Sequence, residues 1–253
     1  VGSEFPMTTL SKNTLSLVTQ VMSELGSFGI DCPEDKAAKL VGHLELLIEK
    51  NKVVNLTRIV DPSSAVTLHV VDSLLPLASQ DVRLEATSTF LDIGTGGGFP
   101  GIPLGVMTGA HGLLVDSVGK KVKAVNEFIS ELGVDGLEAR HTRVEELAHE
   151  IPGSQDYVFA RAVAQSNVLI EYATPLLRRD GLLVIQKARP EIEELTCAER
   201  AAKLCGLTLV SRETFELRDG LGHREILMYR KTSKSKIKLP RRVGLASKEP
   251  LGM

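Results

Sequence analysis

Residues 92–101 read Asp-Ile-Gly-Thr-Gly-Gly-Gly-Phe-Pro-Gly and continue a short apolar run, starting at Phe90, that is typical of a buried strand. Glycines after a strand allow the backbone to turn sharply and to approach a ligand without interference from Cβ atoms. A helix that starts after such a turn presents free N–H groups to that ligand. The segment therefore predicts a cofactor-binding loop at the end of a strand in an α/β protein.

Two classes of cofactor are bound by loops of this kind. Dinucleotides are bound by Gly-x-Gly-x-x-Gly, but Phe99 stands at the position of the third glycine. Methyltransferases hold the amino-acid end of S-adenosylmethionine with an acidic residue followed by Gly-x-Gly-x-Gly. The matching residues are Asp92, Gly94, Gly96 and Gly98. We therefore expect S-adenosylmethionine, with an NAD-dependent oxidoreductase or a plain surface loop as alternatives.

Short apolar runs alternate with amphipathic stretches from residue 88 onward, which predicts parallel strands joined by crossover helices. The expected strands are 90–93, 113–116, 156–160, 182–185, 207–210 and 226–229, and the expected helices are 122–132, 166–177 and 190–205. Because no helix separates the last two strands, one of them should be antiparallel. Asp116 ends the second strand, where its carboxylate can accept hydrogen bonds from both ribose hydroxyls of either cofactor class.

The residues before 88 predict helices and no strand. Apolar residues recur at helical period over 15–25 and 40–48, and a third helix is expected from about 63 to 78. We therefore expect an N-terminal helical cap over residues 7–83 and one α/β domain over 84–253.

Composition and charge limit the possible partners and the cell compartment of the protein. The formal net charge of the 253 residues is −2, so any contact with nucleic acid must come from local patches. The three cysteines form neither a CxxC pair nor a zinc spacing, which favours a reducing cytoplasm and no metal site. No apolar run approaches the roughly 20 residues that span a bilayer, and no signal sequence is recognisable, so we expect no membrane association. Residues 1–6 look like an expression-vector remnant before Met7.

Residues 230–248 form a basic C-terminal tail. They contain eight Lys or Arg residues and no acidic residue. We expect Lys234, Lys236 and Lys238 to contact RNA phosphates, and the alternative is a solvated, disordered tail.

Residues 92–104 resemble the signature of the glucose-inhibited division protein B (RsmG) family, because few methyltransferase loops continue with Phe-Pro-Gly-Ile-Pro. Segments that also resemble this family are 55–57, 69–74, 116–121, 143–146, 161–164, 186–187 and 239–251. Gln186 departs from the pattern, since many members have a small or apolar residue there.

The resemblance implies a class I S-adenosylmethionine-dependent methyltransferase, Rossmann-like, with a seven-stranded, mostly parallel sheet and an N-terminal helical extension. It implies N7 of a guanine in the 530 loop of 16S ribosomal RNA as the acceptor, in a 30S subunit or assembly intermediate, with a monomer favoured. The implied cofactor residues are Gly94, Gly96, Phe99, Asp116, Val144, Glu145 and Arg161. The candidate substrate-binding residues are Asn55, His69, Arg143, Lys187, Arg241 and Arg242.

Arg161 is the candidate catalytic residue, because it follows a strand at the edge where ligands bind in open α/β sheets. Its alternative role is a surface ion pair with Glu145 or Asp156. The alternative role of Lys187 is that of a solvated lysine at the end of a strand. The alternative role of His69 is that of a polar group in the core or at a helix cap.

Guanine N7 carries a lone pair and no proton, so its methylation needs alignment rather than a base or a covalent intermediate. The lack of a recognisable Cys or Ser nucleophile agrees with this acceptor. A non-catalytic RNA-binding module that uses the basic tail is the alternative from another class of protein.

Overall fold

The structure is a computed structural model that describes residues 12–253. The expected vector remnant and the first residues of the expected cap, 7–11, lie outside the described residues.

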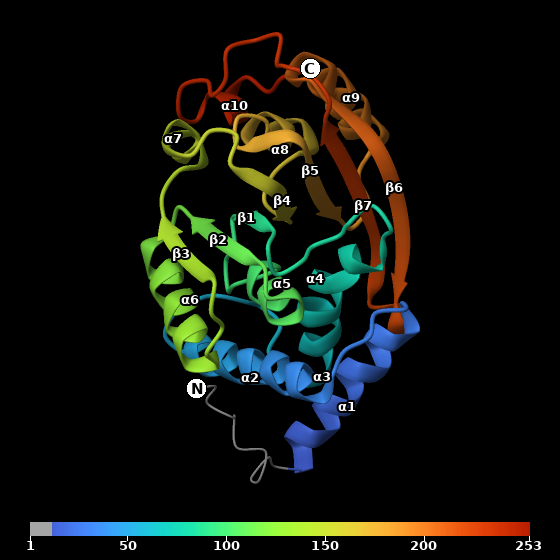
Figure 1. Ribbon diagram of the computed structural model, residues 1–253. Helices are drawn as coiled ribbons and strands as arrows, with labels where there is room; N and C mark the ends of the chain where they lie inside the picture. The colour runs from blue at the N-terminus through green and yellow to red at the C-terminus, as the bar shows by residue number, and fades with distance from the viewer. Residues whose placement is uncertain (1–11) are drawn as a thin grey trace.

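A seven-stranded sheet forms the centre of the molecule, in the order β3-β2-β1-β4-β5-β7-β6 (Figure 1). The strands are β1 Thr89–Ile93, β2 His111–Asp116, β3 Leu137–His141, β4 Gln155–Arg161, β5 Leu177–Lys187, β6 Leu207–Leu217 and β7 Gly222–Lys231. The first five are parallel, and β7 runs antiparallel to both β5 and β6. The expectations of a mostly parallel sheet and of one antiparallel strand near the end are confirmed.

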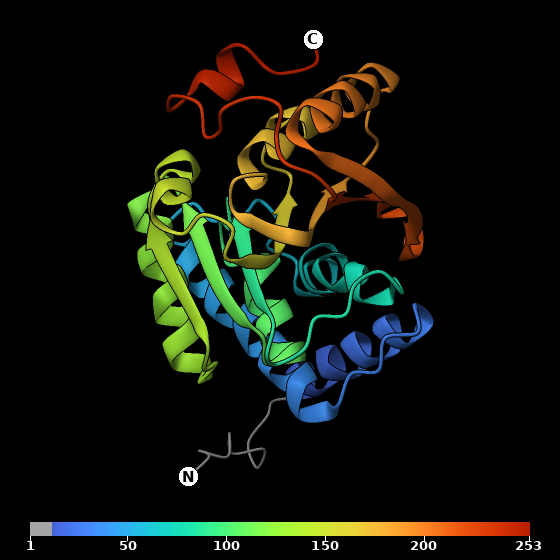
Figure 2. The ribbon, with the colours of Figure 1, turned by 45° about the horizontal axis from the view of Figure 1, so that its top comes forward.

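Helices cover both faces of the sheet (Figures 1 and 2). They are α5 Gly101–Thr108, α6 Gly119–Leu132, α7 Val144–Glu150, α8 Ser166–Ala173, α9 Ile192–Cys205 and α10 Leu245–Lys248. Successive side chains of a strand point to opposite faces. In β1, Phe90 accordingly packs in the cluster with α6, whereas Leu91 packs in the cluster with α7, α8 and α9.

The N-terminal helices share a core with the sheet. They are α1 Lys12–Ser27, α2 Glu34–Asn51, α3 Pro62–Ala65, a π-helical segment Val66–Val71, α4 Asp72–Leu74 and a 3-10 turn Leu75–Ala78. α2 packs against α5 and α6, and its residues Leu40, Leu44 and Leu47 belong to the same hydrophobic cluster as Phe90. The cap is therefore continuous with the sheet's own core.

The third expected helix has the expected extent but changes pitch along its length. It begins where the Asp61 carboxylate accepts a hydrogen bond from Ser64 N (2.8 Å) and where Pro62 takes the first helical position. Its π-helical turn places His69 and the following Asp72 towards the sheet, where both are buried.

Several elements differ from the sequence expectation. β3 and α7 were not expected, and β5 and β6 are longer than the expected strands 182–185 and 207–210. The helix expected over 166–177 ends at Ala173 because β5 already starts at Leu177. β3 lies at the edge of the sheet, and only Ala139 in it is buried. An edge strand of this kind needs no apolar run, which is why the pattern search missed it.

The chain after β7 packs back over α8 and α9 (Figure 2). Lys236 N donates to Leu204 O (2.8 Å), and the Asn167 side chain donates to Leu251 O (2.8 Å). The expectation that the tail could be disordered is therefore wrong. Lys234, Lys236 and Lys238 nevertheless have exposed side chains.

Candidate active site

The glycine loop connects β1 to α5 in a conformation that requires glycine. Gly94, Gly96 and Gly98 have positive φ angles of 72°, 58° and 95°. A Cβ atom on Gly94 would lie 2.6 Å from a methyl group of Val163, and one on Gly98 would lie 2.6 Å from Ile102. The glycines therefore satisfy the backbone conformation and the packing together.

Two carboxylates hold this loop. Asp92, fully buried in β1, accepts a hydrogen bond from Gly101 N (2.9 Å) at the start of α5. Burial raises the pKa of Asp92 to about 6. Asp116 accepts from Gly96 N (3.0 Å) with one oxygen and from Val118 N (2.9 Å) with the other. The expected strand-end carboxylate thus lies beside the loop.

A cavity of about 390 Å³ opens at Asp116, and we call it the Asp116 cavity. Its lining residues are Ile93, Gly94, Val115–Val118, Lys121, Thr142–Glu145, Ala162–Ala164, Tyr172 and Ser247. Val144 and Glu145 line it, as expected for residues beside a base. The Glu145 carboxylate accepts a hydrogen bond from Gly244 N (2.8 Å), so the tail closes one side of the cavity.

A second cavity of about 430 Å³ lies on the other side of the loop, and we call it the Arg161 cavity. The cap contributes Leu56, Ile59, Leu68, His69 and Asp72 to its lining. The loop contributes Gly94–Gly97 and Phe99, and the other lining residues are Lys121, Arg161, Ala162, Gln186–Ala188 and Arg224. Gly94, Lys121 and Ala162 line both cavities, which therefore adjoin at the glycine loop.

Arg161 is held by the cap. Its Nη1 donates to Leu68 O (2.9 Å) and to the carboxylate of Asp72 (3.0 Å). Its guanidinium carbon lies 5.5 Å from the centre of the Phe99 ring. The alternative of an ion pair with Glu145 or Asp156 is wrong, because the cap supplies the partner.

Asp72 binds a second arginine that the sequence reasoning missed. Arg224 Nε donates to the other oxygen of Asp72 (2.9 Å), and the Gln186 side chain donates to the backbone oxygen of Asp72 (2.6 Å). Asp72 lies within a segment that carries the family resemblance, which was an available signal. Nothing in the sequence around Arg224 connects it to the site, because the contact depends on β7 running antiparallel beside β5.

Three rings stack behind the loop. The ring of Phe99 lies between His43 (centroids 4.4 Å apart) and His69 (4.8 Å), both nearly parallel to it. His43 Nε2 is 2.9 Å from Gly97 O, and His69 Nε2 is 2.7 Å from the hydroxyl of Thr57.

Both histidines are neutral. Burial lowers the pKa of His43 to about 4. Burial and the charge of Arg161 lower the pKa of His69 to about 3. His69 thus lines the Arg161 cavity as an uncharged ring.

The remaining expected substrate residues are dispersed. The Lys187 amine, 15% exposed, binds Glu194 (2.8 Å) and lines the Arg161 cavity, so it is not a solvated strand-end lysine. Arg143 is exposed and lines the Asp116 cavity. Asn55 is exposed and lines neither cavity.

The two tail arginines also differ. The Arg241 guanidinium binds the buried carboxylate of Glu171 through two nitrogens, at 2.7 and 2.5 Å, and is not free to bind a phosphate in this conformation. Arg242 is exposed.

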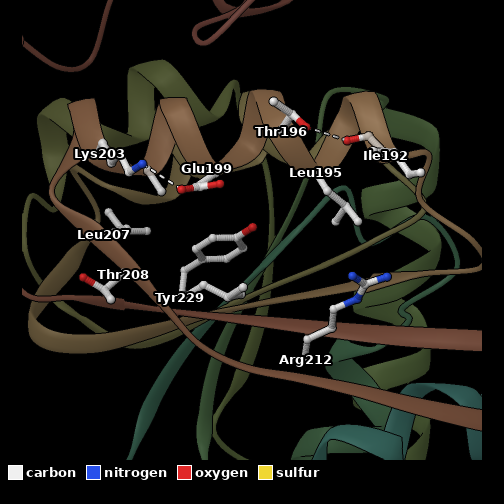
Figure 3. A pocket seen from close by; sticks show the side chains of 11 residues that line it. Ile192, Leu195, Thr196, Glu199, Lys203, Leu207, Thr208, Arg212 and Tyr229 are labelled. Atoms are coloured by element: carbon white, nitrogen blue, oxygen red, sulfur yellow. Dashed lines mark hydrogen bonds and ion pairs between the residues drawn. The ribbon is translucent and has the colours of Figure 1, made fainter.

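A larger cavity of about 530 Å³ lies away from the loop, between α9 and the β6–β7 pair (Figure 3). The Tyr229 ring points into it, with Leu195 on the α9 side. Its charged groups are paired, Lys203 with Glu199 (2.7 Å) and Arg212 with Glu225 (2.7 Å). None of the expected site residues lines this cavity, and its size alone assigns it no function.

The described residues 12–253 contain no cluster of three or more His, Cys, Asp or Glu side chains suited to a metal ion. Within the same range, no helix is both long enough and apolar enough to cross a membrane.

The residues present fit S-adenosylmethionine. The Asp116 carboxylate faces the Asp116 cavity where ribose hydroxyls would need an acceptor, and Val144 offers an apolar contact to a flat base. The loop brings backbone close to the boundary between the two cavities without a Cβ in the way. The fold and this site define the class of S-adenosylmethionine-dependent methyltransferases. More particularly, the chain belongs to the family described as rRNA small subunit methyltransferase G, whose pattern matches residues 36–223.

Curated relatives match nearly the whole chain. The chain is 35% identical over 228 residues to "Ribosomal RNA small subunit methyltransferase G" of Carboxydothermus hydrogenoformans. The aligned residues cover 88% of this chain and 95% of the relative. It is 35% identical over 231 residues to the protein of the same name from Alkaliphilus metalliredigens, with 90% and 95% covered. Family membership excludes the NAD-dependent oxidoreductase and the non-catalytic module.

Solved structures agree on the fold. A SAM dependent methyltransferase from Aquifex aeolicus superposes with a TM-score of 0.52 at 18% identity, covering 73% of this chain and 98% of that one. A putative sarcosine dimethylglycine methyltransferase from Galdieria sulphuraria has a TM-score of 0.50 at 14% identity, with 65% and 86% covered.

Proposed function

We propose that this protein transfers the methyl group of S-adenosylmethionine to N7 of a guanine in the 530 loop of 16S ribosomal RNA. The observation that carries the choice of acceptor is the lining of the Arg161 cavity. Its one carboxylate, Asp72, is bound by two arginines, and its one amine on β5, Lys187, is paired with Glu194. Neither of these two groups is free to remove a proton, and His69 is a weak base because its pKa is lowered to about 3, which suits an acceptor that has no proton to lose.

The chain's own residues would act by binding and alignment. Bound S-adenosylmethionine supplies a methyl group on a sulfonium, which reacts with a lone pair in one displacement. Gly94 and Gly96 would hold its amino-acid end, Asp116 its ribose, and Val144 and Glu145 its adenine. Arg161 lines the Arg161 cavity and precedes Ala162, which lines both cavities. Arg161 would orient the reacting groups, an effect that corresponds to effective molarities of roughly 10⁵ M or more.

The RNA partner would approach over the open side of the Arg161 cavity. Asn55 and Arg242 are exposed and remain candidate contacts, as do the tail lysines at 234, 236 and 238. We propose a cytoplasmic monomer that acts on 16S ribosomal RNA within a 30S subunit or an assembly intermediate. We also retain the division into a cap, 7–83, and a methyltransferase domain, 84–253.

The test is mass mapping of methylated guanines in 16S ribosomal RNA from cells with and without this protein. We expect one N7-methylguanine in the 530 loop that depends on the protein and is restored by the wild type but not by Arg161→Ala. In vitro, labelled donor and 30S particles should give the same modification. A methyl group at another base or atom, or none, would refute the proposal.

A further inference from the structure

Arg224 lies in the Arg161 cavity although it is far from Arg161 in sequence. It is near the start of β7, which reaches this edge because β7 pairs antiparallel with β5. Its Nε donates to Asp72 (2.9 Å) and its Nη1 to His223 O (2.8 Å), and its side chain is 16% exposed. The guanidinium is thus held at two points, and Nη2 has no bond to any residue in the described range 12–253.

Asp72 binds the two arginines through different carboxylate oxygens. Arg161 uses one carboxylate oxygen and lies over Phe99, next to the glycine loop. Arg224 uses the other oxygen and has no bond to the loop. One carboxylate neutralises only one of the two guanidinium charges. The cavity therefore contains, besides Arg161, a second positively charged hydrogen-bond donor that is held in place.

The cap supplies an apolar wall for the same cavity. Leu56, Ile59 and Leu68 are half-buried side chains that line it, and they offer a surface for the flat face of a base. A purine on this wall with N7 directed at the loop would present the substituent on C6 beside N7. In guanine that substituent is an acceptor, O6, and in adenine it is an amino donor.

We propose that Arg224 selects guanine by donating a hydrogen bond from Nη2 to O6 of the acceptor base, an inference that rests on the proposed function. The donor must contact O6 alone, because N7 has to keep its lone pair for the methyl group. Adenine would place its amino group against the guanidinium and leave two donors unpaired. A site built to bond one polar group discriminates strongly against an analogue that lacks it.

The experiment is a double-substitution cycle between protein and RNA. Particles of 30S are reconstituted with 16S RNA that carries either guanine or 2-aminopurine at the target. 2-Aminopurine keeps N7 but has hydrogen in place of O6. Single-turnover rates at saturating donor are measured for the wild type, for Arg224→Met and for the control Arg212→Met. Arg212 is likewise an arginine bound to a carboxylate, but it lies outside the cavity.

The quantity compared is the ratio of the guanine rate to the 2-aminopurine rate, because this ratio cancels the effect of the variant on overall rate. We expect the ratio in Arg224→Met to be roughly 10- to 100-fold smaller than in the wild type, as for a charged hydrogen bond. The control should keep the wild-type ratio. Calorimetry should show that Arg224→Met binds S-adenosylmethionine like the wild type.

Equal ratios in the wild type and Arg224→Met would overturn the inference while leaving the proposed function intact, since guanine would still be methylated. If Arg224→Met slows methylation of both bases equally, Arg224 contacts the RNA backbone rather than the base, and the inference is also overturned. If Arg224→Met does not fold, Arg224→Lys keeps a cation beside Asp72 but lacks the second terminal nitrogen, and it provides the same ratio. Failure of the wild type to methylate the guanine at all would refute the proposed function itself.

Discussion

Replacing Arg161 by lysine keeps a positive charge and removes a planar fork of donors. In the structure one nitrogen of Arg161 bridges Leu68 O (2.9 Å) and Asp72 (3.0 Å). The lysine side chain is shorter and its amine is not a planar fork, so we expect it to keep at most one of these two contacts. A hydrogen bond with a charged partner contributes about 1.5–3 kcal/mol. We therefore expect Arg161→Lys to lower the free energy of unfolding by about 2 kcal/mol and Arg161→Ala by about 4 kcal/mol.

For a chain of this length each 1 kcal/mol corresponds to a fall in Tm of about 2–4 °C, so thermal melts resolve the two variants. Activity should fall more steeply than stability. A misplacement of about 1 Å in an aligned site costs about 10²-fold in rate, and both variants lose the bridge that fixes the guanidinium. Single-turnover methylation of 30S particles at saturating donor, below the melting range of all variants, measures this effect.

Arg178 provides a matched control. It pairs with Asp156 (2.5 Å), but its side chain is 63% exposed. Exposed pairs contribute only about 0–1 kcal/mol, so Arg178→Lys and Arg178→Ala should leave both Tm and rate near the wild type. Recovery of most activity in Arg161→Lys would mean that charge alone matters. Near-normal rates in both Arg161 variants would remove this residue from the active site.

Three other predictions follow from named contacts. The pKa values of His43 and His69, lowered to about 4 and 3, mean that the unfolded chain binds protons that the folded chain does not, so stability should fall as pH drops from about 6.5 towards 4. The free energy of unfolding from urea titrations should depend less steeply on pH in His43→Phe, because this substitution removes a contribution on the order of 3 kcal/mol. An unchanged dependence on pH would show that His43 is protonated in the folded protein. Gly94→Ala combines positive φ with a clash and should abolish S-adenosylmethionine binding by calorimetry, whereas Gly133→Ala, with positive φ and open space, should not. Arg241→Leu leaves a buried carboxylate unpaired and should destabilise by about 3–5 kcal/mol in urea unfolding, and a loss below about 1 kcal/mol would contradict the structural role of this bridge.

Local sequence pattern accounts for most of the sheet. The central strands were placed from their apolar runs, because burial on both faces leaves a continuous apolar signature. β5 and β6 extend well beyond the expected runs, and most of β6 is not buried. β3 escaped because an edge strand needs little burial, and the pitch changes in the third helix escaped because periodicity does not report pitch. The glycine loop was predictable for a different reason, since its backbone conformation admits few other residues.

The parts of the site that were missed come from long-range contacts. Asp72 and Arg224 are 152 positions apart and meet only because an antiparallel strand returns to the cap. His43 lies on a helical stripe like its apolar neighbours, so nothing in the pattern separates its bond to Gly97 from ordinary core packing. The basic residues of the tail were expected to contact RNA, whereas Glu171 holds one of its arginines against α8.

The docked tail also has a consequence for synthesis of the protein. Ser247 lines the Asp116 cavity, and Gly244 binds the carboxylate of Glu145 at its edge. The ribosome makes these residues after the glycine loop and every strand of the sheet. A nascent chain can therefore fold its sheet before the cofactor cavity has all of its walls. The protein would thus acquire its complete donor site only after its whole sheet has been made, so chains that stop before Gly244 would lack the assembled activity.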